Sequence, residues 1–385
     1  MNNNKLQSFD LNDNLDDLTY LSLKNNAIKS FTISSKRASK VTEIYLDSNQ
    51  LIELDLSQFH SLKKLSAKNN KIAKLTLSKK LKHLDLLELN SNQLTEFVWP
   101  HLDISEASIT DNLLYKFEIS SGLQINVKNN RITTFTADWT QLDISENRLE
   151  SIPTSSVLKK LHLDIRNNNI RNGKVENINF SNLKFSDNIK LIRCSIDQLE
   201  TTTGFTFDQT SIKSMKLMNV TDRVNIYDSF VEKAKVRYSK PDFDIDSNSK
   251  ISDLSINYCD LSNSLPFING INSLDLSHNG ITTDVLKSIK LNKGIKNLDL
   301  SFNYIQKLPT NFFKGIVFEN LDLSANDLSI VDQFPKRVDR FLFGENENLK
   351  CDCQLKKFIE DNENINYYCQ MAFMGPCVTN CPTVC

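Results

Sequence analysis

The chain has 385 residues and a formal net charge of −1, because its 46 Lys and Arg nearly balance its 47 Asp and Glu. Without a field of either sign, the composition does not favour nucleic acid or an anionic membrane as a partner. Only 9 Gly and 8 Pro are present, which argues against long flexible linkers. No stretch approaches the ~18 to 20 apolar residues that a membrane-spanning helix requires.

One pattern, L-x-x-L-x-L-x-x-N-x-L, can be followed along nearly the whole chain. Its clear copies are residues 18–28, 41–51, 62–72, 84–94, 271–281 and 295–305. Apolar residues alternate within a copy, and copies recur at roughly 20 to 24 residues, as in repeat arrays and unlike a single amphipathic helix. The L-x-L core predicts one short strand per repeat, with the leucines inward and the x residues on the concave face of a parallel sheet.

The position that is usually Asn sets the register of the array. We expect its amide to be buried and to satisfy backbone groups that would otherwise be unpaired. In chain order this position falls at Asn14, Asn26, Asn49, Asn70, Asn92, Ala107, Asn130, Asn147, Asn168, Asn188, Thr210, Ser229, Cys259, Asn279, Asn303, Asn326 and Asn346.

Residues 1–349 are therefore predicted to form a leucine-rich-repeat solenoid, an α/β repeat fold, of roughly 15 to 17 repeats. Its convex side should be mostly loops and short 3₁₀ turns, since the coils are too short for helices. Residues 189–250 fit the pattern least well. Within them, residues 233–250 leave two interpretations open, a loop or a decayed repeat.

Six of the 8 cysteines are crowded at the end of the chain, in residues 350–385, which we predict to be a separate C-terminal cap: Cys351, Cys353, Cys369, Cys377, Cys381 and Cys385. An even, crowded set is typical of a disulfide framework from an oxidising compartment. Zinc is the alternative, but only one residue separates Cys351 from Cys353, closer than the usual spacing of zinc ligands. The first residues contain no apolar signal segment, so we expect that the sequence starts inside the array and that a signal peptide is missing from it.

The segment that follows the last repeat resembles the C-terminal flanking cap of animal extracellular leucine-rich-repeat proteins. The matching residues are Leu349, Cys351, Cys353, Leu355 and Phe358. This resemblance implies the pairs Cys351–Cys369 and Cys353–Cys377. Cys381 and Cys385 depart from the family pattern, and they leave two outcomes: an internal bridge, or a link to a partner that would give a disulfide-linked oligomer. The short, irregular, Asn-rich repeats also resemble those of insect leucine-rich-repeat immune proteins, which implies an extracellular role in innate immunity.

No catalytic motif is present, so we expect neither an enzyme nor a cofactor or metal site. A row of Asp residues occupies the middle strand position: Asp103, Asp143, Asp275, Asp299 and Asp322. We interpret the row as repeat consensus rather than a cation site, because oxygens spaced at ~4.8 Å along a sheet do not converge on one ion.

Residues that break the consensus on the concave face are better candidates for recognition of a protein partner. We place Arg223, Tyr227, Asp228, Tyr258, His278 and Phe302 there, on consecutive strands. Exposed Tyr and Arg are typical anchors of protein interfaces. The N-terminal strands are more basic, with Lys24, Lys64, Lys68 and Lys128; a sulfated sugar could bind there, although Glu43, Asp47 and Glu88 intervene.

The remaining candidates are two cysteines and two sequons. Cys194 and Cys259 lie within the repeats, too far apart to form a bridge, and Asn179 and Asn219 begin N-x-S/T glycosylation sequons. Together these features favour a secreted or cell-surface protein-binding module. The alternatives are a cell-adhesion protein or receptor ectodomain cut off before its membrane anchor, and an intracellular scaffold with free thiols.

Overall fold

The computed structural model describes residues 1–11, 17–33, 40–157, 161–170, 173–186, 189–192, 194–240, 242–259, 261, 270–349, 353–361 and 366–368. The chain divides into two compact units. Unit 1 comprises residues 1–173 and 179–187, and unit 2 comprises residues 174–178 and 188–385. In the described part of the chain, no helix has the length and apolar character needed to cross a membrane.

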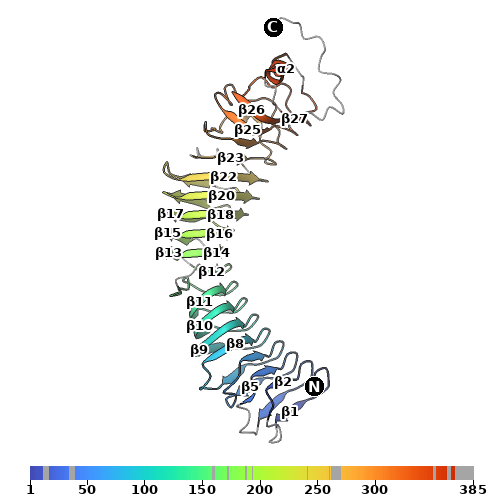
Figure 1. The fold of residues 1–385 in the computed structure, drawn as a ribbon, viewed down its shortest axis with the longest axis vertical. Coiled ribbons are helices and arrows are strands. Elements are labelled where there is room, and N and C mark those ends of the chain that lie inside the picture. Colours follow the sequence, from blue (N-terminus) through green and yellow to red (C-terminus); the bar gives the residue numbers. More distant parts are fainter. Residues whose placement is uncertain are drawn as a thin grey trace. The chain divides into compact units, whose positions relative to one another are not determined.

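Unit 1 is a stack of coils that each add one strand to a parallel sheet, the main sheet (Figure 1). Its strands are β2 (Tyr20–Ser22), β4 (Glu43–Tyr45), β6 (Lys64–Ser66), β8 (His83–Glu88), β9 (Glu96–Ser108), β10 (Lys116–Asn126), β11 (Thr134–Asp143), β12 (Leu161–Asp164) and β14 (Asn179–Phe185). Each strand pairs in parallel with the next, as the repeat pattern predicts.

The other side of each coil in unit 1 carries fewer strands. β1 (Ser8–Leu11) pairs with β3 (Ser30–Ile33), and β5 (Glu53–Leu56) pairs with β7 (Lys74–Leu77). Strands β9, β10 and β11 are long enough to run from this side onto the main sheet, with a shift in register within the β10 pairings. Phe97, Phe117 and Phe135 stack at 5.5 and 5.3 Å between ring centroids along this side.

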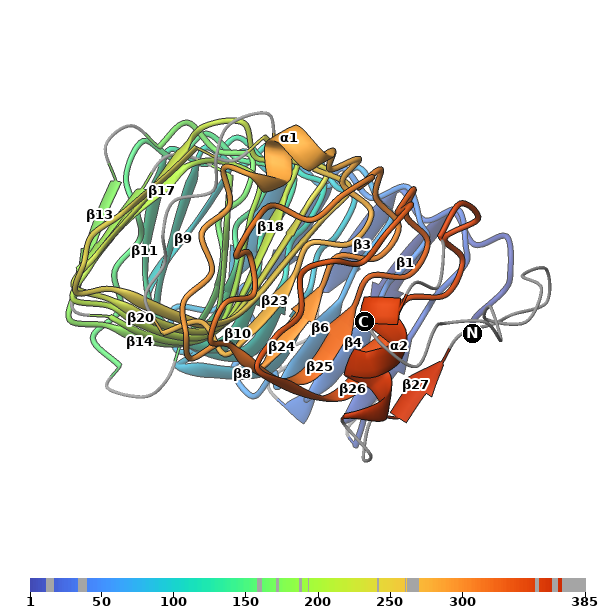
Figure 2. The ribbon, with the colours of Figure 1, turned by 90° about the horizontal axis from the view of Figure 1, so that it is seen from above.

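Unit 2 contains main-sheet strands and, in addition, a second parallel sheet. The main sheet contains β16 (Ser195–Thr201), β18 (Ser211–Met218), β20 (Phe230–Arg237), β22 (Lys250–Asn257), β23 (Ser273–Asp275), β24 (Asn297–Asp299), β25 (Val317–Asp322), β26 (Arg337–Leu342) and β27 (Asn366–Tyr368). The second sheet contains β13 (Gly173–Glu176), β15 (Ile189–Ile192), β17 (Phe205–Asp208), β19 (Arg223–Tyr227) and β21 (Asp242–Ile245). In the end-on view, β13 and β17 lie along a different side of the coil from β20 (Figure 2).

The second sheet corrects the expectation of a loop-rich outer side for this part of the chain. Its strands alternate buried apolar and outward polar residues, as in Phe205-Thr206-Phe207 and Val224-Asn225-Ile226. This alternation is the pattern of a half-buried strand. Residues 233–240 and 242–250 are likewise repeat rather than loop: they contain most of β20 and all of β21. In β20, Ala234 and Val236 are buried and alternate with exposed Lys and Arg.

The Asn ladder is confirmed where the motif is clear, and one position must be moved. Asn70 shows the general pattern: its Nδ2 donates to the carbonyls of Leu46 and Ala67, and its Oδ1 accepts from the amide of Leu51. Asn26, Asn49, Asn92, Asn130, Asn147, Asn168, Asn279, Asn303, Asn326 and Asn346 do the same.

The ladder residue of the coil after Asn92 is Asn112, not Ala107. Ala107 lies within β9. The short spacing of 15 residues from Asn92 to Ala107 therefore came from a wrong alignment of this repeat. Thr210 and Ser229 form a different ladder that follows strands β17 and β19 of the second sheet, with Thr210 N donating to Ser229 Oγ. Asn14 and Asn188 lie outside the described residues.

The last described coil is covered by the helix α2 (Cys353–Glu360). Leu349 and Leu355 are buried, and the Phe358 ring stacks on Phe334 at 4.6 Å and meets Phe341 edge-on at 6.3 Å. The side chains of all six terminal cysteines lie outside the described residues, so the disulfides and the predicted boundary at residue 350 stay predictions. A short second helix, α1 (Thr283–Leu286), begins at the N-cap Thr282.

Candidate functional site

The turn after each main-sheet strand places one residue in the left-handed backbone region. This residue directly precedes the ladder position, and its φ lies near +55° along the array, as at Asn25 (56°), Asn69 (54°) and Asn167 (56°). Asn is among the few residues with a side chain that adopt this conformation readily. Unit 1 uses small or polar residues at these turns, which is what backbone sterics alone would select.

Unit 2 places aromatic residues at four consecutive copies of this turn: Tyr238 (φ 52°), Tyr258 (55°), His278 (59°) and Phe302 (54°). Bulky residues such as Tyr and Phe are genuine outliers in this region, whereas His is enriched there. A backbone conformation of this kind costs of order 1 to 3 kcal/mol, and such residues cluster at sites where they serve a function. Three outliers among four consecutive aromatic turns therefore mark this turn row as a candidate functional site.

The four side chains form a continuous stack of rings, the aromatic stack. Ring centroids are 5.5 Å apart between Tyr238 and Tyr258, 4.9 Å between Tyr258 and His278, and 4.3 Å between His278 and Phe302. Interplanar angles are only 23°, 15° and 12°. Even so, Tyr238, Tyr258 and Phe302 remain 55%, 48% and 51% exposed.

This geometry decides what the stack can contact. The inner ring faces are occupied by neighbouring rings, so a ligand meets the ring edges, the tyrosine hydroxyls and the imidazole nitrogens. Ring edges carry the positive part of the aromatic quadrupole and suit carbonyl oxygens and other rings. The turns beyond the two ends of the stack carry no aromatic ring: Asn219 next to Tyr238, and Ala325 next to Phe302. A row of edges with polar tips is typical of a protein-binding surface.

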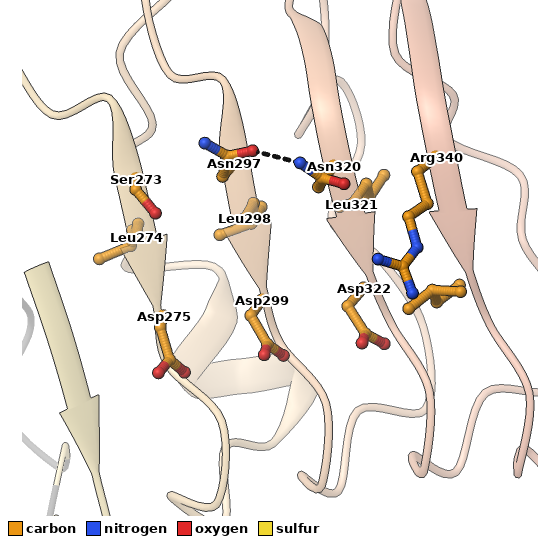
Figure 3. Close-up of a pocket in the computed structure, with 11 residues that line it drawn as sticks. Ser273, Leu274, Asp275, Asn297, Leu298, Asp299, Asn320, Leu321, Asp322 and Arg340 are labelled. Carbon is orange, nitrogen blue, oxygen red and sulfur yellow. Dashed lines mark hydrogen bonds between the residues drawn. The ribbon is translucent and has the colours of Figure 1, made fainter. Parts of the chain in front are cut away.

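Beside the stack lies the part of the Asp row that belongs to unit 2 (Figure 3). Asp275, Asp299 and Asp322 follow one another on β23, β24 and β25 and line a hollow of about 180 Å³. Each carboxylate accepts from the amide and hydroxyl of the Ser two residues later, as Asp299 does from Ser301 at 2.8 and 2.6 Å. Burial is the main cause that raises the pKa of Asp299, with repulsion from the neighbouring aspartates adding to it.

These bonds show that the Asp row shapes the turns that carry the aromatic stack. The hollow is smaller than the roughly 300 to 1,000 Å³ of small-molecule pockets. Within the described residues, no group of three or more His, Cys, Asp or Glu is arranged to hold a metal ion. The arrangement suits surface contact with a macromolecule.

The six residues predicted to form one binding surface fall into two groups on different faces of the coil. Tyr258, His278 and Phe302 come together in the aromatic stack. Arg223, Tyr227 and Asp228 belong to β19 and the turn after it, in the second sheet, and therefore not to consecutive strands with the first group. The sequence-based assignment of repeat positions is displaced by half a coil in residues 205–229. The reason is that the strands of both sheets alternate apolar and polar residues there.

Arg223 and Tyr227 are engaged with the next strand of their own sheet. The Arg223 guanidinium contacts Asp242 at 3.0 Å, and the Tyr227 hydroxyl donates to Asp244 at 2.9 Å. The hydrogen bond to Asp242 is the main cause that raises the pKa of Arg223, and the one to Asp244 is the main cause that raises the pKa of Tyr227. The Asp228 backbone amide donates to Asp246. The side chains of Arg223 and Tyr227 already have partners, which makes these two residues weaker candidates than the stack.

Tyr238 is the residue of the stack that the sequence pattern missed. Its segment was interpreted as a loop or a decayed repeat. The available signal was the triplet Arg237-Tyr238-Ser239, in which Ser239 takes the ladder position: its Oγ donates to the carbonyl of Arg237 and accepts from the amide of Val220. Ser replaces Asn here, so the motif was not recognised.

The remaining predicted residues are placed as follows. Cys194 and Cys259 are buried free thiols at ladder positions, and burial raises the pKa of both. The sequon residues Asn179 and Asn219 are exposed. Asn219 occupies the turn directly before Tyr238.

No protein-family model matches the chain, and no curated protein matches it. Among solved structures, the functional domain of InlJ from Listeria monocytogenes is 14% identical, with 86% of this chain and 70% of that chain covered and a TM-score of 0.38. The leucine-rich effector YopM from Yersinia pestis is 18% identical, with 83% and 74% covered and a TM-score of 0.29. YopM from Yersinia enterocolitica is also 18% identical, with 90% and 88% covered and a TM-score of 0.30. At this level of similarity, the chain's own residues carry the functional evidence.

Proposed function

We propose that this chain is an extracellular recognition module that binds a protein partner through the aromatic stack. The observation that carries the proposal is the row of four half-exposed rings held at turns where backbone sterics favour Asn. The ring edges and hydroxyls offer apolar area together with polar tips, a combination enriched at protein interfaces. Binding rather than catalysis is proposed because the side chains gathered here are aromatic rings in a shallow surface.

Secretion or display at the cell surface is supported by the cysteine-rich end of the sequence and by the exposed sequons at Asn179 and Asn219. A role in innate immunity rests on the family resemblance alone. A cell-adhesion protein or receptor ectodomain is the second candidate, and a membrane span encoded downstream would favour it. Arg223, Tyr227 and Asp228 are a separate, secondary contact surface in this proposal.

The test compares secreted wild-type protein with the variant Tyr258→Asn/His278→Asn/Phe302→Asn. Asn is chosen because Asn25, Asn69 and Asn167 adopt the same turn, so the backbone is preserved. The matched control is Tyr304→Asn, which removes a ring that is 63% exposed and outside the stack.

Proteins of the extracellular medium that are captured by wild type and by the control, but not by the triple variant, would support the proposal. Capture of the same proteins by the triple variant would refute the site. Non-reducing electrophoresis of the same samples decides whether Cys381 and Cys385 link the chain to another.

A further inference from the structure

Basic side chains in the two units differ in whether they form ion pairs with carboxylates. In unit 1, each Lys of the predicted basic region faces a carboxylate on a neighbouring coil: Lys24–Asp47 at 2.8 Å, Lys64–Glu43 at 3.2 Å, Lys68–Glu88 at 2.9 Å and Lys128–Glu146 at 3.1 Å. Acceptance of a sulfated sugar at these lysines would require those ion pairs to be broken. The sequence-based expectation of an anion site there is therefore not favoured.

A second set of cations lies on the main sheet of unit 2. Lys233, Lys235 and Arg237 project from β20, and Lys216 projects from β18 directly opposite Lys235. We call these four residues the β20 basic cluster. All four are exposed, and within the described residues Lys233, Lys235 and Arg237 form no ion pair. Lys216 lies 3.6 Å from Glu200.

The surroundings of the cluster leave it net positive. On the flanking strands, Lys235 faces Ser255, Arg237 faces Asn257 and Met218, and Lys233 faces Ser214 and Asp253. Asp253, Glu200 and, on β20 itself, Glu232 are thus the acids next to the four cations, which leaves an excess of one positive charge. Like charges directly opposite on neighbouring strands, such as Lys216 and Lys235, destabilise a sheet. No carboxylate lies between Lys216 and Lys235 in the strand pairing to reduce this repulsion. We infer that an anion from outside the chain does so.

The composition of the cluster indicates what kind of anion. Three of its four cations are Lys, a residue depleted from protein interfaces, whereas Lys suits diffuse contact with the many charges of a polyanion. At the edge of the cluster, Arg237 is followed by Tyr238, whose ring stacks on Tyr258 at 5.5 Å between centroids and whose side chain is 55% exposed. An exposed aromatic ring can pack against the C–H groups of a sugar ring while neighbouring cations hold its anionic groups.

We propose that the β20 basic cluster, with the exposed ring of Tyr238, binds a linear sulfated polysaccharide. This site is independent of the protein partner proposed for the aromatic stack, because the cations lie on the outer face of β18 and β20 and only Tyr238 belongs to both. Nucleic acid is disfavoured by the net charge of −1 and the small area of the cluster.

The test measures binding to heparin over 50 to 200 mM NaCl, a range in which four anion contacts would change affinity by about two orders of magnitude. The cluster variant is Lys233→Ser/Lys235→Thr/Arg237→Thr. Its matched control is Lys64→Ser/Lys68→Ser/Lys128→Gln, which removes the same net charge from unit 1 and creates no N-x-S/T sequon after Asn126. We expect the cluster variant to lose at least about tenfold in affinity, with a salt slope lower by roughly two to three, and the control to change less than about twofold.

Three further measurements keep the test decisive. Tyr238→Asn should weaken binding without changing the salt slope, and Lys235→Gln alone should lower the slope by about one if the triple variant folds poorly. Desulfated heparin should not bind. Equal losses in the cluster variant and its control, absence of heparin binding at 50 mM NaCl, or equally tight binding of single-stranded DNA of the same charge would each overturn the proposal.

Discussion

Replacement of Asn303 by Ala tests how strongly a single ladder residue holds the array. Its Nδ2 donates to the carbonyls of Leu276, Leu300 and Ser301 at 3.0, 2.9 and 3.1 Å. Its Oδ1 accepts from the amides of Ile281 and Asn279 at 2.9 and 3.1 Å. The Asn303 side chain is only 4% exposed, so Ala would leave these groups without water to replace it. Each orphaned buried group costs about 1 to 3 kcal/mol, and two amides lose their acceptor, so we expect about 3 kcal/mol of destabilisation or more.

The measurement is amide hydrogen exchange, because repeat arrays can open locally and a single unfolding midpoint is then poorly defined. Exchange at Ile281 and Asn279 should accelerate by about two orders of magnitude, the equivalent of about 3 kcal/mol. The control is Asn320→Ala, which removes an exposed Asn bonded to Asn297 at 2.6 Å and should change stability by less than about 0.5 kcal/mol. An effect of Asn303→Ala no larger than that of the control would refute the buried-ladder account.

Three further predictions concern titration and reactivity. Burial and the hydrogen bond to Glu43 raise the pKa of Tyr45 to about 12, so a spectrophotometric titration should lose one late phenolate step in Tyr45→Phe and keep those of Tyr115 and Tyr227, whose pKa values are also raised. Because burial raises the pKa of Asp299 in the folded state, the protein loses stability as pH rises above the value for an unfolded Asp; Asp299→Asn should remove that loss, and an unchanged pH dependence of the opening free energy at the Leu300 amide, measured by hydrogen exchange, would contradict it. Cys194 and Cys259, whose pKa values are raised by burial, should react with a thiol reagent only after unfolding, and rapid labelling of native protein would count against their burial.

The solenoid could be predicted from the sequence wherever the ladder residue is Asn. Asn recurs at this position because its buried amide must both donate and accept hydrogen bonds. The predicted ladder residues are correct from Asn26 to Asn92 and from Asn279 to Asn346. The prediction failed at Ala107, where a nearby alternation of apolar residues in β9 imitated the motif. The true ladder residue, Asn112, sits in the segment Ile109-Thr110-Asp111-Asn112, which keeps the normal spacing.

The candidate site could be predicted only in part, for a physical reason. In residues 189–250 both sheets carry apolar residues at every second position, so the sequence alone does not tell which side of the coil a strand occupies. Arg223 and Tyr227 were therefore placed with Tyr258, although their strand β19 belongs to the second sheet. Tyr238 joins the ring stack because its backbone is left-handed at this turn. The repeat sets that conformation, and the residue type alone would not have predicted it.

The central claim is that the aromatic stack contacts a partner, and site-specific photo-crosslinking tests it most directly. A photoreactive phenylalanine analogue, p-benzoylphenylalanine, is placed at Tyr258 in one sample and at Tyr304 in another, and each secreted protein is irradiated in the extracellular medium of cells that express it. We expect a discrete adduct from position 258 that excess wild-type protein suppresses, and none of that size from position 304. The same adducts from both positions, or none from position 258, would contradict the claim.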